Sequence, residues 1–462
     1  MRLNYKTLYN HSPVWLQNII ISVYGYKLYK QRYGLVYHKT FNRLIKKEYS
    51  NYKNEVANQE TLLQNFLVKV VDKSKFYKEL YKDIDLSKIK KIEDLKLLPI
   101  VGKEDLRANI NDVYTISKKE AIQTFTGGTT GKSLKILFSK DDFQKRMAYL
   151  DSFKYKVGLK DPFKAKKATF SGRDITTSNT SKIFWRNNYI YNQRLYSTFN
   201  LTEKNLPFYI INLNRFKPEI INGFVSAIYE LADFIKRNNL SLSFKPSAIF
   251  TTSETLLPFH RKLIENVFDA PIYNQYASAE GAPFITECTH KNLHYNLDTG
   301  IIETKETPEG NQMIITSFTS SGTPLIRYNI EDCITFKKGE CKCGSKHPLV
   351  ERIEGRKVDY LISKEKGKIS LSHLADVIKG IPNSVKKMQF VQDSLDLIVV
   401  LLVIDPVLYI EDHYNEILSE MIYRFGKNTK IDIKLVDDIP KEKSGKYSLI
   451  KNRIKQTKVN QI

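Results

Sequence analysis

Long apolar runs are missing from this chain of 462 residues. No run reaches the roughly 18 residues that a membrane-spanning helix needs, and the 42% hydrophobic content is that of a globular protein. The N-terminal apolar patch is short and is interrupted by Gln17 and Asn18, which argues against a signal peptide. We therefore expect a soluble, cytoplasmic protein.

Acidic residues are scarce relative to basic ones. The chain has 73 Lys and Arg against 50 Asp and Glu, which gives a net charge of +23. Such an excess can indicate a polyanionic partner, for example nucleic acid, an acidic glycan or an anionic membrane surface. The basic residues are spread along the whole chain, however, which favours a general compositional bias. Because the sequence has no RNA-binding signature, zinc finger or basic heptad array, we expect no specific nucleic-acid partner.

The length exceeds that of one ordinary core and predicts two domains. Apolar residues recur at helical spacing over residues 13–36 and again over residues 52–80, so the first 95 residues are expected to form a helical leader. Core packing is the simpler interpretation of the first stretch. A peripheral membrane contact through Trp15 and neighbouring Lys and Arg residues is the alternative.

A glycine- and hydroxyl-rich loop lies between two short apolar stretches, at TFTGGTTGKSLKIL over residues 124–137. Glycines let a backbone approach phosphates closely, and hydroxyls and a lysine add donors and charge. A flexible hairpin is the alternative for such a run. A Walker loop is excluded, because only three residues separate Gly127 from Gly131. The loop residues of interest are Thr126, Gly127, Gly128, Thr129, Thr130, Gly131 and Lys132.

Helices and strands are predicted to alternate after this loop. The predicted elements are a helix from the Ser139 cap to Gly158, a strand over Lys167–Gly172, a helix from Pro218 through Ile235, a strand at Ala248–Phe250, a helix from Pro258 and a strand at Ile272. The last three form a parallel crossover. Ligand-binding loops of such sheets follow the carboxyl ends of the strands, so Ser253–Glu254 and Asn274–Glu280 are expected on one rim.

Six motifs follow one another in the order TGGTTGK, TTSE, NQYASAEG, RYNIED, EGRKVD and PKEKSGK. This succession resembles the adenylate-forming enzymes. It is most similar to the phenylacetate-CoA ligase branch and, within that branch, to the adenylating proteins of capsular polysaccharide synthesis. The resemblance implies an α/β fold, with a large N-terminal AMP-binding domain of mixed sheets and helices over residues 1–355. A small, mobile α+β lid domain would follow over residues 356–462.

The resemblance also implies a role for each motif. The glycine loop would hold the β- and γ-phosphates of ATP, and Glu280 would bind a magnesium ion. Asp332 would accept hydrogen bonds from the ribose hydroxyls, and Arg356 would contact ribose or phosphate. The adenine pocket would consist of Ser253, Glu254, Asn274 and Tyr276, with the ring of Tyr276 facing the base.

Lys446 would be the catalytic lysine, bridging the substrate carboxylate and the α-phosphate. A positioned ammonium stabilises the charge that develops when one anion attacks another. Some positions depart from the superfamily pattern. Ala279 replaces a common threonine before Glu280, Asn329 and Glu331 stand where arginine and glycine are usual, and Val358 occupies an acidic hinge position.

The four cysteines, Cys288, Cys333, Cys341 and Cys343, all lie within one short segment, and His290 and His294 lie beside the first. In a reducing compartment such clustering favours a tetrahedral structural zinc site over scattered thiols. The C-x-C spacing is less specific than C-x-x-C, so reduced core cysteines are the alternative.

The resemblance therefore implies a ligase that uses ATP and Mg²⁺ to convert a carboxylic acid, either small or glycan-linked, into an acyl-adenylate. The acyl acceptor stays open between coenzyme A and an amine or hydroxyl used in surface-polysaccharide assembly. The alternative from another class is a non-catalytic component that binds ATP or a polyanion and keeps the adenylating fold.

Overall fold

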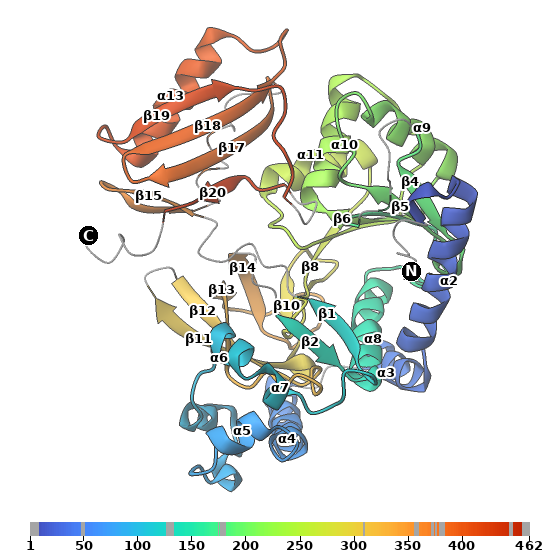
Figure 1. The fold of residues 1–462 in the computed structure, drawn as a ribbon, viewed down its shortest axis with the longest axis vertical. Coiled ribbons are helices and arrows are strands. Elements are labelled where there is room, and N and C mark those ends of the chain that lie inside the picture. Colours follow the sequence, from blue (N-terminus) through green and yellow to red (C-terminus); the bar gives the residue numbers. More distant parts are fainter. Residues whose placement is uncertain are drawn as a thin grey trace.

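The computed structural model describes residues 9–47, 51–125, 134–173, 175, 182–307, 310–354, 360–370, 374, 377, 384–442 and 447–454. One large body holds the chain up to β14, and a smaller body holds the strands and the helix that follow (Figure 1). The predicted boundary between residues 355 and 356 falls outside the described residues.

The chain begins with helices. They are α2 (Val14–Arg32), α3 (Leu35–Lys46), α4 (Tyr52–Val71), α5 (Lys75–Leu80), η1 (Leu86–Lys88), η2 (Ile92–Leu97), α6 (Lys103–Ala108) and α7 (Ile110–Val113). Side-chain caps explain two of the starts, because Asn51 and Ser74 accept hydrogen bonds from the backbone N–H groups of Asn54 and Tyr77. The helical pattern predicted over residues 13–36 and 52–80 is confirmed, with breaks between the helices of each stretch. None of the described helices combines the length and apolar character that crossing a bilayer requires.

A 12-stranded sheet forms the centre of the large body, in the order β11-β12-β13-β14-β10-β9-β8-β7-β6-β3-β5-β4. Its first half in sequence comprises β3 (Lys167–Ser171), β4 (Trp185–Asn188), β5 (Gln193–Ser197), β6 (Ile220–Phe224), β7 (Ala248–Thr252) and β8 (Ile272–Tyr276). Apart from the edge strand β4, these strands run parallel, as the crossover pattern predicts. The helices of this half are α8 (Lys140–Lys156), α9 (Leu206–Phe216), α10 (Val225–Arg237) and α11 (Pro258–Phe268).

The predicted helix from Pro218 is wrong in its first turns. Ile220 to Phe224 form strand β6, which pairs in parallel with β3 and β7, and helix α10 begins only at Val225. A strand buried on both faces reads as a continuous apolar run, so Ile220 and Phe224 match a helical spacing by coincidence. Gly223 is needed here, because a Cβ would lie 2.4 Å from the carbonyl oxygen of Phe170.

The second half of the sheet is antiparallel. It comprises β9 (Ile285–Glu287), β10 (Leu293–Tyr295), β11 (Gly300–Thr307), β12 (Gly310–Ser317), β13 (Tyr328–Lys337) and β14 (Leu349–Glu354), with the short turn η4 (Leu297–Thr299). A separate antiparallel pair, β1 (Ile122–Phe125) and β2 (Lys135–Phe138), flanks the glycine loop. The two apolar stretches that flank the glycine loop are therefore paired strands.

The smaller body has its own sheets and its own core. It contains β15 (Tyr360–Ser363), β16 (Gly367–Ser370), β17 (Val385–Ser394), β18 (Leu397–Ile404), α13 (Glu411–Phe425), β19 (Lys430–Leu435) and β20 (Ile450–Asn452). Phe390, Ile417 and Phe425 are fully buried in this core. In Figure 1 this body lies beside α10 and α11. Ion pairs join the two bodies, since Glu230 of α10 lies 2.9 Å from Lys387 and 3.3 Å from Lys441.

Candidate functional site

The carboxyl ends of β6, β7 and β8 lie side by side. Thr251 of β7 is the register partner of both Gly223 of β6 and Asn274 of β8. The loops that follow β7 and β8 therefore leave the sheet on the same rim, as expected for Ser253–Glu254 and Asn274–Glu280.

Glu254 is held in place by the start of helix α10. Its carboxylate accepts a 2.7 Å hydrogen bond from the backbone N–H of Ser226 and a 3.0 Å bond from the Ser226 hydroxyl. A carboxylate at this point is also favoured by the helix dipole. Ser253 is exposed and has a φ of 69°, a left-handed conformation that is uncommon for a serine and turns the chain sharply.

Asn274 lies on β8, two residues before the end of the strand. Its side-chain oxygen accepts hydrogen bonds from the Thr251 hydroxyl (3.4 Å) and the backbone N–H of Gln275 (2.9 Å). The residue lines a cleft of about 250 Å³ together with Arg261, Glu287, Lys291 and Lys337. Tyr276, Glu280 and Asp332 do not line this cleft.

Tyr276 and Asp332 meet directly. The Tyr276 phenol donates a 2.6 Å hydrogen bond to Oδ2 of Asp332, and both residues are half-buried. The bond brings the end of β8 to β13. Two side chains that were predicted to contact the nucleotide thus lie next to each other.

Glu280 is 3% exposed and lies on the loop after β8. Gly281, which follows it, has a φ of 101°, and a Cβ there would lie 3.1 Å from Phe138 and Ser320. A glycine is therefore needed at this turn, and it fixes the path of the backbone on which Glu280 is carried.

Arg146 of helix α8 contacts this loop from inside the protein. Its guanidinium donates hydrogen bonds to the carbonyl oxygens of Gly281 (3.0 Å) and Ala282 (3.3 Å) and to the hydroxyl of Thr319 (2.8 Å), and it stacks 4.3 Å from the ring of Phe284. Burial lowers the pKa of Arg146 to about 10, and the carboxylates of Asp142 and Glu280 oppose that shift. Arg146 could not be identified as a site residue from the sequence, because it lies within the apolar stripe of α8 and belongs to no motif.

The strand that enters the glycine loop also reaches this turn. The hydroxyl of Thr124, on β1, donates a 3.3 Å hydrogen bond to the carbonyl oxygen of Ala279, the residue before Glu280. Thr126, Gly127, Gly128, Thr129, Thr130, Gly131 and Lys132 themselves lie outside the described residues.

Arg356 and Lys446 lie outside the described residues as well. Lys441, five positions before Lys446, donates a 2.5 Å hydrogen bond to the carbonyl oxygen of Thr198. Thr198 follows the carboxyl end of β5. Strand β5 pairs in parallel with β3, β3 pairs in parallel with β6, and β6 pairs in parallel with β7, so the carboxyl ends of all four strands lie at the same edge. Lys441 therefore contacts the same rim from which the loops after β7 and β8 leave the sheet.

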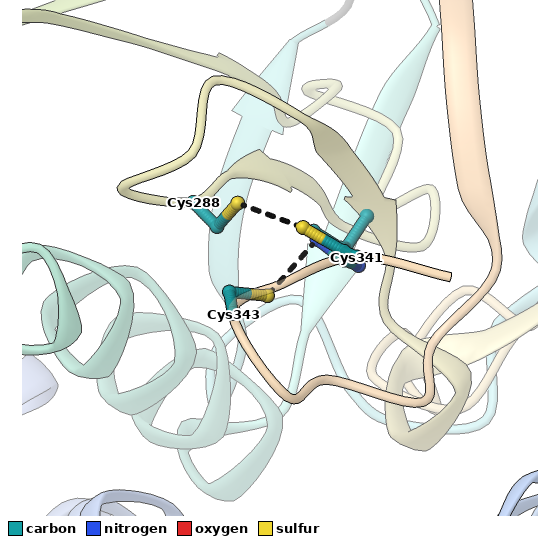
Figure 2. A group of neighbouring side chains, drawn as sticks. Cys288, Cys341 and Cys343 are labelled. Carbon is teal, nitrogen blue, oxygen red and sulfur yellow. Dashed lines mark hydrogen bonds between the residues drawn. The ribbon is translucent and has the colours of Figure 1, made fainter. Parts of the chain in front are cut away.

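A second cluster combines three cysteines and one histidine. The ligand atoms of Cys288, His294, Cys341 and Cys343 all lie within 4.8 Å of one another. Figure 2 shows the three labelled sulfurs pointing toward one another, Cys288 from one loop and Cys341 and Cys343 from another. Sγ of Cys288 lies 3.6 Å from Sγ of Cys341, too far for a disulfide, and Sγ of Cys343 lies 3.4 Å from Nε2 of His294.

These distances match a tetrahedral zinc site. Zn–S bonds of about 2.3 Å place neighbouring sulfurs about 3.8 Å apart. Nδ1 of His294 lies 3.2 Å from the carbonyl oxygen of His347, which can only accept, so Nδ1 carries the proton and Nε2 presents its lone pair. Burial lowers the pKa of His294 and so favours the neutral imidazole. The donor set fits zinc in its chemistry, and the separations of Cys288 from Cys341 and of Cys343 from His294 fit the geometry of such a site.

The predicted inclusion of Cys333 in this cluster is wrong. Cys333 is the register partner of Glu354, whereas His294 is the partner of Leu349 on the same strand β14. Five residues of strand span about 17 Å, so the Cys333 thiol is too far away to share a metal ion. His294, noted in the sequence only as a neighbour of Cys288, takes the fourth place.

Comparisons with known proteins agree with the family resemblance. The profile of the CapK C-terminal domain matches residues 361–453. Protein CapK of Staphylococcus aureus is 37% identical over 458 residues, which cover 98% of this chain and 100% of that protein.

Solved structures with the same fold include 2-hydroxyisobutyryl-CoA ligase. Its postadenylation complex with 2-HIB-AMP has a TM-score of 0.71 at 15% identity and covers 89% of this chain and 91% of that chain. Its complex with 2-HIB-AMP and CoA has a TM-score of 0.56 at 16% identity, with 89% and 92% covered. The predicted α/β fold of an adenylate-forming enzyme with a C-terminal domain is confirmed.

Proposed function

The chain belongs to the CapK family, and we propose that it is an adenylate-forming ligase that activates a carboxylic acid with ATP. An oxygen of the substrate carboxylate attacks the α-phosphorus of ATP, the bond from that phosphorus to the bridging oxygen breaks, and pyrophosphate leaves. The acyl-adenylate then passes its acyl group to a nucleophile and releases AMP.

One observation carries this proposal. The hydrogen bond from Thr124 to Ala279 brings the entrance of the glycine loop to the turn that carries Glu280. A triphosphate held by the loop would therefore lie next to Glu280, the residue that would hold the magnesium ion. The ion supplies positive charge that offsets the phosphates when bound. Arg146 keeps the Glu280 turn in place from inside the protein.

The nucleoside end of ATP is assigned to the rim of the parallel strands. The carboxylate of Asp332 accepts hydrogen bonds from the ribose hydroxyls. The hydrogen bond from the Tyr276 phenol orients this carboxylate toward the ribose. Ser253, Glu254 and Asn274 form the remainder of the adenine pocket, and Arg356 contacts ribose or phosphate. In this assignment Glu254 acts mainly by holding the loop, since both of its oxygens accept from Ser226.

Lys446 stabilises the charge that develops as the carboxylate attacks. The contact of Lys441 with Thr198 supports this role, because it attaches the chain at Lys441, five positions before Lys446, to the rim of the parallel strands. A single positioned donor of this kind typically contributes about 3–4 kcal/mol to the transition state.

Two acceptors are compatible with the fold, coenzyme A and an amine or hydroxyl used in surface-polysaccharide assembly. The solved relative of the same fold binds both an acyl-adenylate and CoA. Acid-dependent exchange of pyrophosphate into ATP, screened with uronic acids, amino acids and aryl acids in the presence of Mg²⁺, tests the first step. Coenzyme A or an amino sugar is then added together with the acid that supports exchange. The mass of the product identifies the acceptor of the second step.

A non-catalytic member of this fold would behave differently. Ala279, which stands where a hydroxyl is common, is the feature that favours it. Such a protein would bind ATP or a polyanion, and no acid would support exchange.

A structural zinc ion is assigned to Cys288, His294, Cys341 and Cys343. The site would join the loop between β9 and β10 to the loop before β14, and so brace the antiparallel half of the sheet.

A further inference from the structure

Helix α2 covers the edge of the large sheet with polar side chains. The side chain of Asn18 accepts a 2.8 Å hydrogen bond from the backbone N–H of Asn187. The hydroxyl of Ser22 accepts a 3.1 Å hydrogen bond from the backbone N–H of Tyr189. The side chain of Gln17 accepts a 2.5 Å bond from Arg186. These contacts satisfy the edge strand β4 and the turn that follows it.

The face of α2 beside these polar contacts is apolar and exposed. Trp15, Ile19, Val23 and Tyr26 are 64%, 46%, 65% and 49% exposed. At 100° per residue these four side chains fall within about 80° of one another and extend along about 16 Å of helix. We call them the outer stripe. A helix that buries Gln17 and Asn18 while the four apolar side chains of the outer stripe are exposed is arranged for contact with something apolar outside the protein.

The charged residues of helix α2 are all basic, namely Lys27, Lys30 and Arg32. Residues 1–47 contain nine Lys and Arg and no Asp or Glu, although the whole chain has 50 acidic residues. Lys27 and Lys30 are exposed on α2 beside the stripe, and Nζ of Lys30 lies 4.9 Å from the ring centre of Tyr26. Long lysine side chains at the border of an apolar stripe can bring their charge to phosphate groups.

We propose that α2 is a monotopic anchor that lies on an anionic lipid membrane. The outer stripe enters the boundary between headgroups and acyl chains, with Trp15 and Tyr26 at its ends, and Lys27 and Lys30 contact lipid phosphates. A protein partner would need a matching apolar groove and an acidic rim. A fluid anionic surface supplies both features to a single convex helix without a dedicated groove. The inference is independent of the proposed ligase activity.

The position of α2 suits an anchor. In Figure 1 the helix runs along the flank of the large body, away from the smaller C-terminal body. Membrane contact through this flank would leave the C-terminal body clear of the lipid.

Co-sedimentation of the full chain with vesicles tests the proposal. We expect binding to vesicles of equal parts phosphatidylglycerol and phosphatidylcholine, and little binding to phosphatidylcholine alone. Trp15→Ser combined with Val23→Ser should weaken binding at least tenfold. Lys27→Gln combined with Lys30→Gln should weaken it by roughly 30-fold at low salt, because each charge near an anionic surface contributes about 1 kcal/mol. In a Trp185→Phe background, the emission of Trp15 should shift to shorter wavelength on binding.

The matched control is the pair Val407→Ser and Tyr423→Ser, two side chains of the smaller body that are 84% and 77% exposed. These changes should leave vesicle binding unaltered. The proposal is overturned if the unmodified protein does not bind anionic vesicles, or if the control pair weakens binding as much as the stripe pair does. Self-association that the stripe variant abolishes, in the absence of vesicle binding, would assign the stripe to a protein interface instead.

Discussion

Tyr276 and Asp332 are joined by a 2.6 Å hydrogen bond, although β14, β10 and β9 separate their strands in the sheet. Four strand spacings amount to about 19 Å across a flat sheet. The antiparallel half must therefore curl until β13 faces the end of β8. The curl brings together two residues that lie 56 positions apart in the sequence.

Replacing Tyr276 with Phe removes the hydrogen bond and keeps the aromatic ring. A bond to a charged acceptor contributes about 1.5–3 kcal/mol, so the KM for ATP in the exchange reaction should rise by roughly 10- to 100-fold. The KM for the acid should change much less. Tyr196→Phe is the matched control, because its buried hydroxyl donates to the side chain of Asn212 on α9, which is not among the predicted nucleotide ligands. It should lower thermal stability and leave the KM for ATP unchanged; an equal rise in both variants would contradict the assignment.

Arg146→Met should reduce both stability and exchange activity. The change leaves the carbonyl oxygens of Gly281 and Ala282 without their buried donor, at a cost of about 2–4 kcal/mol in the free energy of unfolding. Because the Glu280 turn loses its support, the Mg²⁺ concentration for half-maximal exchange should also rise. Arg194→Met is the control, since Arg194 bonds Asn187 and Asn212 and stacks on Phe216 far from this turn. An unchanged Mg²⁺ requirement in Arg146→Met would rule out a positioning role.

Metal analysis distinguishes the zinc ligands found in the structure, which include His294, from the set predicted from the sequence, which includes Cys333 instead. Protein purified without chelators should contain one zinc per chain, and Cys288→Ser or His294→Ala should lose it together with several degrees of thermal stability. Cys333→Ser should retain the metal, because Cys333 lies at the far end of β14 from the cluster. Zinc-free unmodified protein, or loss of zinc in Cys333→Ser, would contradict the assigned site.

Glu230 lies at the contact between the two bodies. Its carboxylate pairs with Lys387 and Lys441 of the smaller body, so Glu230→Gln should weaken the contact. We expect a larger radius of gyration by small-angle X-ray scattering. Glu265→Gln, which breaks ion pairs with Arg261 and Lys291 inside the large body, is the control and should not change the radius. Equal radii for Glu230→Gln and the unmodified protein would show that other contacts hold the smaller body.

Features encoded by local chemistry could be predicted from the sequence. Ser139 caps helix α8 as expected, accepting from the N–H of Asp142, and the strands on either side of the glycine loop follow from its apolar flanks. The shared rim of Ser253–Glu254 and Asn274–Glu280 followed from the strand–helix–strand pattern, which fixes the direction of β7 and β8.

Features that depend on register and curvature could not be predicted. The choice between Cys333 and His294 depends on which residues of β13 and β10 oppose β14, and sequence spacing does not contain this register. The role of Arg146 depends on helix α8 passing beneath a loop more than 130 positions away. The start of β6 was missed because a buried strand leading directly into a helix shows one continuous apolar pattern.

Acid-dependent pyrophosphate exchange by the unmodified protein and by Lys446→Ala tests the central claim most directly. We expect one of the screened acids to support Mg²⁺-dependent exchange, and Lys446→Ala to reduce its rate at saturating ATP by about 100-fold or more. Lys451→Ala, whose lysine pairs with Glu442, is the control and should keep most of the activity. Absence of exchange with every acid, or an unchanged rate in Lys446→Ala, would contradict the assignment of this chain as an adenylate-forming ligase.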